Sequence, residues 1–148
     1  MPHLLDTSAL LAHCRNEKGS DRVQELFDED DEQIFLCSIS LPELTRRLRE
    51  LGADERGISD LVAHYKQLVD EIVPVDGSIA ERSDDVIRAA TARIPLFDAL
   101  IASAARSRDA VLVHRDSHMR AIPAKIVRQL DLEAQVQDMG NAGGSGHR

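Results

Sequence analysis

Hydrophobic residues along this chain occur in two patterns, short continuous runs and longer stretches with helical spacing. The short runs are typical of strands that are buried on both faces of a sheet, and they lie at residues 3–5, 34–37, 72–75 and 110–113. Ile126 and Val127 form a shorter apolar pair that is a candidate for a fifth strand at the sheet edge.

The segments between these runs carry apolar residues three and four positions apart, which predicts amphipathic helices. Four such stripes lie within residues 41–51, 58–69, 79–90 and 97–104. We expect the first helix to start with Ser40 as its N-cap, Pro42 in its first turn and Glu43 as the glutamate of a capping box. Helices that separate short buried strands predict a three-layer α/β/α fold with a mostly parallel sheet of four to five strands.

The composition fits one globular domain with a core of aliphatic side chains. The chain has 148 residues, of which 43% are hydrophobic and 30% are charged, and no apolar run approaches the roughly 20 residues of a membrane span. Asp6 interrupts what would be the apolar part of a signal peptide, and Cys14 and Cys37 are too few for a disulfide framework. We therefore expect a cytoplasmic protein.

The net charge of −8 argues against a protein that holds nucleic acid through a broad basic surface. A nucleic-acid substrate would need a local cationic patch or a bound metal instead.

Four acidic residues lie inside apolar segments, at Asp6, Glu43, Asp98 and Asp116. Burying a carboxylate is costly unless it is paired or coordinates a metal. Because no lysine or arginine stands at a fixed spacing from each of these acids, a shared cation is a candidate explanation. The alternative for each acid is a helix cap or a strand-end residue that faces water.

The expected fold places the four acids near one edge of the sheet. Asp6 directly follows the first strand, and Asp116 follows the strand at 110–113. Glu43 and Asp98 each fall in the first turn of a helix, and Ala102 and Ala105 on the Asp98 face would let that helix lie close to the sheet. Ligands of open parallel sheets bind beyond the carboxyl ends of the strands. A carboxylate cluster there suits Mg²⁺ or Mn²⁺, ions that support phosphodiester hydrolysis.

The segments around these acids resemble the successive motifs of PIN-domain ribonucleases. They read LLDTSAL at residues 4–10, LPEL at 41–44, FDALIASAA at 97–105 and LVHRD at 112–116. The resemblance spans residues 1–132 in the family's order and spacing, and the overall length is similar to that of the VapC toxins of toxin–antitoxin modules.

This resemblance implies a PIN-like nuclease domain at residues 1–132, followed by a segment at 133–148 that ends in a flexible Gly-rich tail. The implied activity is that of a Mg²⁺-dependent endoribonuclease, with Mn²⁺ as a substitute ion. The family pattern assigns metal binding and catalysis to Asp6, Glu43, Asp98 and Asp116. It also implies a homodimer, a cognate antitoxin protein, and structured RNA such as tRNA or rRNA as the substrate.

The chain departs from the family pattern at two positions near the fourth acid. His114 stands where a hydroxyl residue is common, and Met119 stands where an aromatic residue is common. These departures concern residues around the acids rather than the acids themselves.

Five further residues are candidates for substrate binding. Thr7 or Ser8 is positioned to touch phosphate or metal-bound water, and either is equally suited to cap the helix that follows. Arg46 and Arg47 lie three and four residues after Glu43, a spacing that fits either an exposed ion pair or a grip on RNA phosphate. The same two interpretations apply to Arg115, the fifth candidate. They apply also to Arg120, which flanks Asp116 on its other side.

Several other functions remain open on the sequence alone. One alternative is a housekeeping PIN nuclease that acts in RNA processing, and another is a degenerate PIN scaffold that only binds a partner. His114 and His118 have the spacing of a zinc pair but no further soft ligands. An adhesion-type metal loop would require a second serine at Leu10, and a phosphatase of the haloacid dehalogenase type would require aspartate at Ser8.

Overall fold

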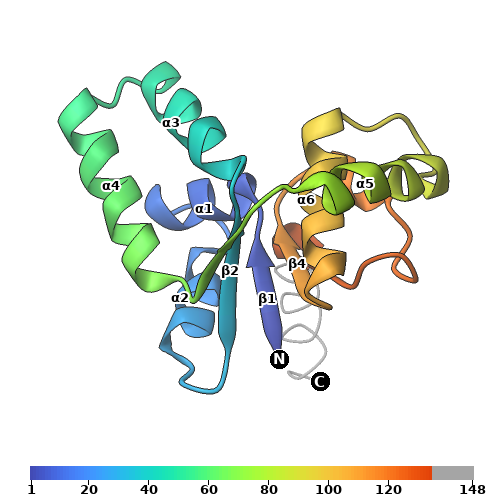
Figure 1. The fold of residues 1–148 in the computed structure, drawn as a ribbon. Coiled ribbons are helices and arrows are strands. Elements are labelled where there is room, and N and C mark those ends of the chain that lie inside the picture. The colour runs from blue at the N-terminus through green and yellow to red at the C-terminus, as the bar shows by residue number, and fades with distance from the viewer. Residues whose placement is uncertain (135–148) are drawn as a thin grey trace, which may run out of the picture.

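The computed structural model describes residues 1–134, which form a five-stranded sheet with helices on both faces (Figure 1). The strands are β1 (Pro2–Leu5), β2 (Gln33–Cys37), β3 (Glu71–Val73), β4 (Val111–His114) and β5 (Gln129–Asp131). Their order across the sheet is β3-β2-β1-β4-β5, and every neighbouring pair is parallel. The prediction of a mostly parallel sheet is confirmed.

Two groups of helices cover the two faces of this sheet. One layer contains α1 (Thr7–Cys14), α2 (Ser20–Asp28), α3 (Ser40–Glu50) and α4 (Glu55–Leu68). The opposite layer contains α5 (Gly77–Ala89) and α6 (Leu96–Ser107). A short 3-10 helix, η1 (Ser117–Ala121), follows β4. The predicted three-layer α/β/α architecture is therefore confirmed.

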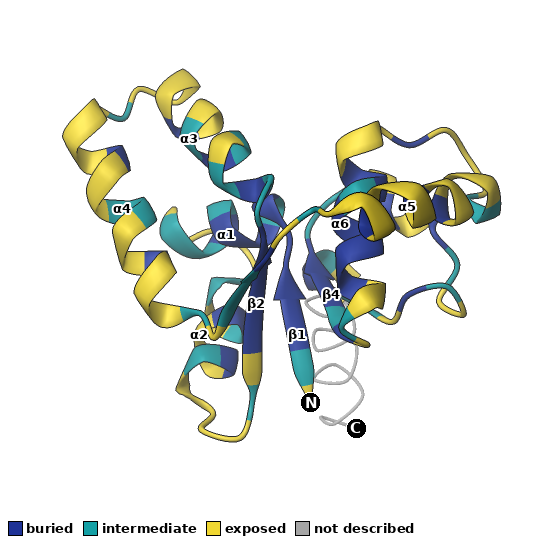
Figure 2. Ribbon diagram, in the orientation of Figure 1, coloured by how far each residue is buried: buried dark blue, intermediate teal, exposed yellow. Residues whose placement is uncertain are grey.

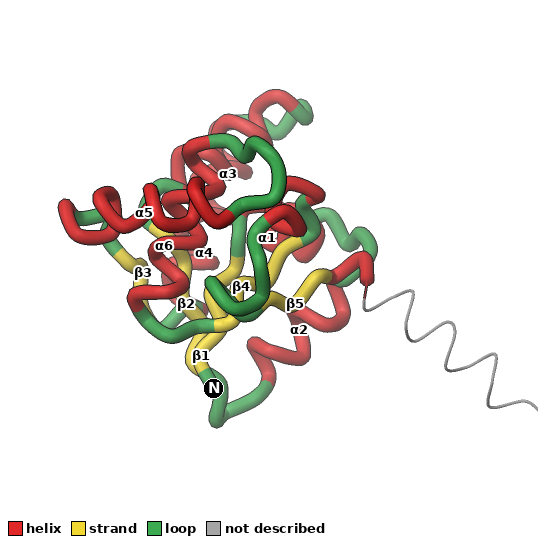
Figure 3. Tube along the Cα trace, turned by 90° about the vertical axis from the view of Figure 1, so that its right-hand side faces the viewer, coloured by secondary structure: helices red, strands yellow, loops and turns green. Residues whose placement is uncertain are grey.

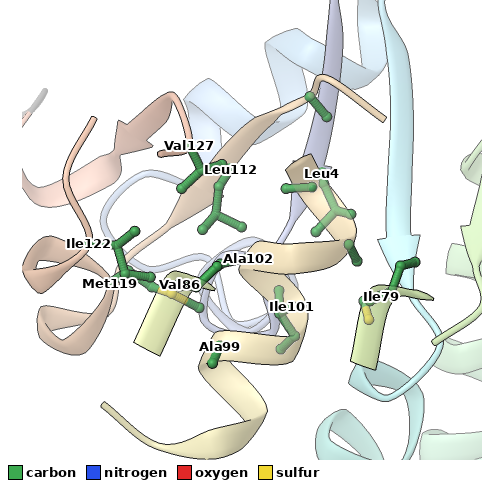
Figure 4. Close-up of a cluster of buried hydrophobic side chains, with 14 of the residues drawn as sticks. Leu4, Ile79, Val86, Ala99, Ile101, Ala102, Leu112, Met119, Ile122 and Val127 are labelled. Atoms are coloured by element: carbon green, nitrogen blue, oxygen red, sulfur yellow. The ribbon is translucent and has the colours of Figure 1, made fainter. Parts of the chain in front are cut away.

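The alternation of side chains along each strand divides the interior into two cores. Leu4 and Leu112 belong to the core beneath α5 and α6, whereas their neighbours Leu5 and Val113 belong to the core beneath α1 to α4. Figure 2 shows the buried strands between the two half-exposed helical layers. Figure 4 shows the first core, where Ala102 of α6 lies near Leu112 of β4. Small α6 residues allow this helix to lie close to the sheet, as the sequence predicts.

The fifth strand is present, but the prediction for its position was wrong. It occupies Gln129–Asp131 at the sheet edge beside β4 (Figure 3), not residues 126–127. Ile126 instead lies in a turn, where its N–H donates to the carbonyl of Pro123 over 2.9 Å, and Val127 is buried in the core. An edge strand exposes part of each side chain, so its polar composition hides it from a search for apolar runs.

The predicted cap of the third helix was also wrong. Ser40 is the first residue of α3 rather than its N-cap, and Ile39 occupies the cap position without a side-chain hydrogen bond. The Glu43 N–H donates to the carbonyl of Ile39 over 3.4 Å. Among residues 1–134, the buried Ser40 hydroxyl has no hydrogen-bond partner.

The end of the described chain packs against the start of α2. Leu132 is fully buried, and a Cβ added to Gly19 would lie 2.7 Å from the Leu132 Cβ. Gly19 also has a φ of +92°, a conformation that side chains of L-residues disfavour. Glycine is therefore required at this position for two reasons. The Gly-rich tail predicted for the C-terminus lies outside the described residues.

Within residues 1–134, no helix combines the length and the apolar character that crossing a membrane requires.

Candidate metal centre

The four acids predicted from the sequence lie around the point where the strand order reverses. The chain moves outward from β1 to β2 and β3, then crosses back to β4 on the other side of β1. Parallel sheets bind ligands at such switch points, beyond the carboxyl ends of their strands. Asp6 follows β1 directly, and its N–H donates to the carbonyl of Val113 in β4 over 2.9 Å.

Asp6 is buried, with only 2% of its surface exposed, and it is the N-cap of α1. The Ser8 hydroxyl donates to Asp6 Oδ2 over 2.6 Å and accepts a hydrogen bond from the Arg115 N–H over 2.9 Å. Burial raises the pKa of the Asp6 carboxyl to about 6, opposed by the Ser8 hydrogen bond and supported by the negative charges of Asp116 and Glu43. Through its two hydrogen bonds, Ser8 links Asp6 in the loop after β1 to Arg115 in the loop after β4.

Asp98 lies in the first turn of α6 and is 7% exposed. Its Oδ2 atom is shielded from solvent and has no hydrogen-bond partner among the described residues. Burial, followed by the charges of Asp116 and Asp6, raises the pKa of the Asp98 carboxyl to about 8. A buried carboxylate oxygen without a donor is a costly arrangement that a bound cation would relieve.

Asp116 follows β4 and is held at both its backbone and its side chain. Its N–H donates to Nδ1 of His114 over 3.1 Å. Its Oδ1 accepts a hydrogen bond from the N–H of His118 over 2.9 Å and lies 3.1 Å from Nδ1 of the same residue. The side chain is 23% exposed, and its carboxylate lies close to that of Asp98.

Glu43 is half-buried in the first turn of α3, and its charge contributes to the raised pKa values of Asp6 and Asp98. Among residues 1–134, Asp98, Asp116 and His118 form a group of potential metal ligands whose ligand atoms lie within 4.8 Å of one another. Asp6 and Glu43 act on this group through their charges.

The sequence prediction missed the place of His118. Its Nδ1 atom lies 3.1 Å from Asp116 Oδ1 and 3.7 Å from Asp98 Oδ2, and 54% of its side chain is exposed. The spacing Asp-x-His in the turn after a buried strand is the signal that could have indicated this arrangement.

His114 does not form a zinc pair with His118. It is fully buried, its Nδ1 accepts from Asp116, and its Nε2 lies 2.8 Å from Gln129 Oε1. The Gln129 amide in turn donates to the carbonyl of Ile122 over 2.8 Å. Burial lowers the pKa of His114, which favours the neutral ring that this network requires.

The arginines predicted to hold substrate differ in their availability. Arg46 and Arg47 are exposed on α3 and pair with Glu50, at 3.9 and 3.2 Å, rather than with Glu43. Arg115 pairs with Glu133 at 2.7 Å and Glu17 at 3.5 Å.

Of the remaining polar residues, Arg120 pairs with Asp131 at the sheet edge. Thr7 is buried, and its hydroxyl has no partner within the described part of the chain. Neither Thr7 nor Ser8 caps α1, because Asp6 holds that position.

Comparison with known proteins identifies relatives at the level of sequence family and fold. The PIN domain family matches residues 3–125. The chain is similar to the VapBC2 structure from Rickettsia felis bound to a promoter DNA fragment, with a TM-score of 0.69 and 18% identity over 88% of this chain and 98% of that one.

Two further solved structures show the same likeness. For VapBC-1 from nontypeable Haemophilus influenzae the TM-score is 0.68, with 17% identity over 90% of this chain and 99% of that one. For DNA-bound VapBC from Salmonella typhimurium the TM-score is 0.67, with 23% identity over 89% and 98%. No curated protein sequence matches the chain significantly.

Proposed function

Because the chain belongs to the PIN-domain family of nucleases, we propose that it is a Mg²⁺-dependent endoribonuclease and the toxin component of a VapBC-type module. The observation that carries this proposal is the buried Asp98 Oδ2, which has no partner among residues 1–134 and lies beside the carboxylate of Asp116. Burying like charges at a sheet switch point is costly, and a bound cation would offset that cost.

We propose that Asp6, Glu43, Asp98 and Asp116 are the metal-binding and catalytic acids. Their donors are carboxylate oxygens, which fit Mg²⁺ and also accept Mn²⁺. When bound, the ion would activate water and stabilise the charge that develops on the phosphate oxygens. The residues of the chain prepare this site: Ser8 orients the Asp6 carboxylate and His114 fixes the backbone of Asp116.

The proposed substrate is structured RNA, such as tRNA or rRNA. Arg46 and Arg47 stand exposed on α3, the helix that carries Glu43, and are proposed to contact the phosphate backbone. Thr7 and Ser8 are proposed to contact phosphate or water at the centre. Arg115 would have to leave Glu17 and Glu133 to take part in RNA binding.

The proposed partner is a cognate antitoxin, since the similar structures from Rickettsia felis, Haemophilus influenzae and Salmonella typhimurium are all described as VapBC. An acidic centre in a chain of net charge −8 attracts arginine and lysine side chains. We propose that such a side chain of the antitoxin occupies the centre and excludes metal or substrate. We also propose that the protein is a homodimer and that it is located in the cytoplasm.

The function is tested by incubating the purified protein with total RNA in Mg²⁺ or in EDTA. Cleavage is expected in Mg²⁺ only, and Asp98→Asn should abolish it, whereas Asp60→Asn, which changes an exposed acid of α4, should leave it intact. Metal-independent cleavage, or full cleavage by Asp98→Asn, contradicts the proposed centre.

The toxin role has its own test in cells. Expression of the chain alone should arrest growth, and co-expression with the adjacent gene should restore growth and yield a stable complex. RNA cleavage without growth arrest would instead favour a housekeeping nuclease. Absence of both cleavage and metal binding would favour a scaffold that only binds a partner.

A further inference from the structure

We infer that His118 supplies a nitrogen ligand to the divalent cation of this centre, together with Asp98 and Asp116. The inference rests on the proposed metal centre and adds to it a donor of different chemistry. It assigns a role to a residue outside the four acids of the family pattern.

The position of the imidazole carries the first part of the argument. His118 Nδ1 lies 3.1 Å from Asp116 Oδ1 and 3.7 Å from Asp98 Oδ2, so the ring faces both carboxylates. The three ligand atoms fall within 4.8 Å of one another, a separation at which one ion can contact all of them. Glu43 and Asp6, the other acids near the centre, are not members of this group.

Local backbone structure holds the ring in this place. Asp116 is the N-cap of η1 and accepts the His118 N–H over 2.9 Å, which fixes the histidine two residues after the acid. The next residue, Met119, is fully buried in the core beneath α6 and anchors the turn. His118 is therefore presented at the centre although its side chain is 54% exposed.

The unpartnered oxygen of Asp98 supplies an independent indication of a ligand. Asp98 is 7% exposed, and its Oδ2 has no hydrogen-bond partner within residues 1–134, yet it is the Asp98 atom that faces His118. A cation bound between the ring and this oxygen would satisfy the oxygen directly.

A nitrogen donor changes which ions the centre prefers. Carboxylates alone suit Mg²⁺, whereas imidazole also suits the first-row transition metals. The neutral ring adds a ligand without adding another negative charge to Asp98 and Asp116, which already lie near the charges of Asp6 and Glu43. We therefore expect a stronger preference for Mn²⁺ and Co²⁺ over Mg²⁺ than four carboxylates would give.

The direct test is pulsed electron paramagnetic resonance of the full chain loaded with Mn²⁺. Wild type should show the nitrogen coupling of a directly bound imidazole, and His118→Ala should lose it. His64→Ala, which removes an exposed histidine of α4, should retain the coupling. Loss of a ligand should weaken Mn²⁺ binding at least as much as loss of an outer-shell partner, roughly 10- to 100-fold.

A second variant tests the chemistry of the donor. His118→Asp keeps a ligand at this position but makes it oxygen, so the ratio of Mn²⁺ to Mg²⁺ affinity should fall. If wild type binds Mn²⁺ without nitrogen coupling and His118→Ala binds it equally well, His118 is an ion-pair partner of the acids and the inference is overturned. If wild type binds neither ion, the proposed metal centre itself is wrong.

Discussion

The backbone N–H of Asp116 donates a hydrogen bond to Nδ1 of His114, a ring buried beneath the sheet edge. This bond requires an unprotonated Nδ1, so the proton of the neutral ring is on Nε2 and faces Gln129 Oε1. The buried ring of His114 thereby fixes the backbone position of Asp116, which lies at the surface of the centre. A hydroxyl residue has the same ability to accept an N–H, which explains how histidine replaces it here.

Removing this ring should destabilise the fold. In His114→Leu the Asp116 N–H and Oε1 of Gln129 lose their partner, and each unsatisfied buried group costs roughly 1–3 kcal/mol. Urea unfolding should therefore show a lower midpoint, and Mg²⁺ affinity should also fall because Asp116 is less firmly held. His114→Leu combined with Gln129→Leu should be less destabilised than the two single changes together, and strict additivity would contradict the network.

The stability of the metal-free protein should fall as the pH rises. Asp6 and Asp98 have an ordinary pKa of 3.8 and folded values of about 6 and about 8, so the folded state retains protons that the unfolded state has released. The resulting stabilisation is complete below pH 4 and is lost as the pH rises through 6 and 8. Melting temperatures measured in EDTA from pH 5 to 9 should show this decline.

The pH effect can be assigned to one residue. Asp98→Asn removes a titrating group, so it should flatten the decline above pH 7, and Asp60→Asn on the exposed face of α4 should leave the curve unchanged. A wild-type curve that already matches that of Asp98→Asn would show that the Asp98 carboxyl titrates normally.

Mg²⁺ should stabilise the folded protein in a concentration-dependent manner. A ligand that binds only the folded state adds roughly 2.7 kcal/mol at one hundred times its Kd. Asp98→Asn and Asp116→Asn should weaken this effect while leaving metal-free stability unchanged or higher, because each removes repulsion among the acids. Lower melting temperatures for both variants, with no Mg²⁺ shift in wild type, would identify the acids as structural caps.

Ser8 should contribute to stability and to the state of Asp6. Ser8→Ala removes two hydrogen bonds, to Asp6 and from the Arg115 N–H, so a loss of roughly 1–3 kcal/mol is expected. The pKa of Asp6 should rise further, since the Ser8 bond lowers it. NMR titration of the Asp6 carboxyl checks the second effect, and Ser78→Ala on the exposed surface of α5 provides the control.

Two glycines offer a matched test of the packing at the chain's end. Gly19 and Gly52 have similar φ values, +92° and +94°, but only at Gly19 would a Cβ meet Leu132, at 2.7 Å. Gly52→Ala should therefore carry the backbone strain alone, of order 1 kcal/mol, and Gly19→Ala should be clearly more destabilised in urea unfolding. Equal losses would mean that Leu132 moves aside without cost.

Those elements that bury a continuous apolar face could be predicted from the sequence. Leu4, Leu36 and Leu112 lie in short apolar runs of the kind that strands covered on both faces favour, and the order of the acids relative to these runs predicted that they lie near one edge of the sheet. The edge strand at Gln129–Asp131 has no apolar run to reveal it, because its side chains remain partly exposed.

The finer structure of the centre depended on tertiary contacts. Serine is a preferred N-cap residue, yet α3 begins at Ser40 itself, one residue earlier than this local preference indicates. The ring of His118 meets Asp98 only because α6 lies against β4, and this contact joins residues that are distant in the chain. Local spacing alone cannot predict such a meeting.

The pairing of β1 with β4 sets when the acidic centre can be completed during synthesis. His3 pairs with Val111, so Asp6 leaves the ribosome long before the strand that completes its surroundings. At roughly 5–20 residues per second, about 5 to 20 seconds of translation separate Asp6 from Asp116. The nascent chain carries an unfinished centre throughout that interval, which gives a cell time to produce the proposed antitoxin before the centre is complete.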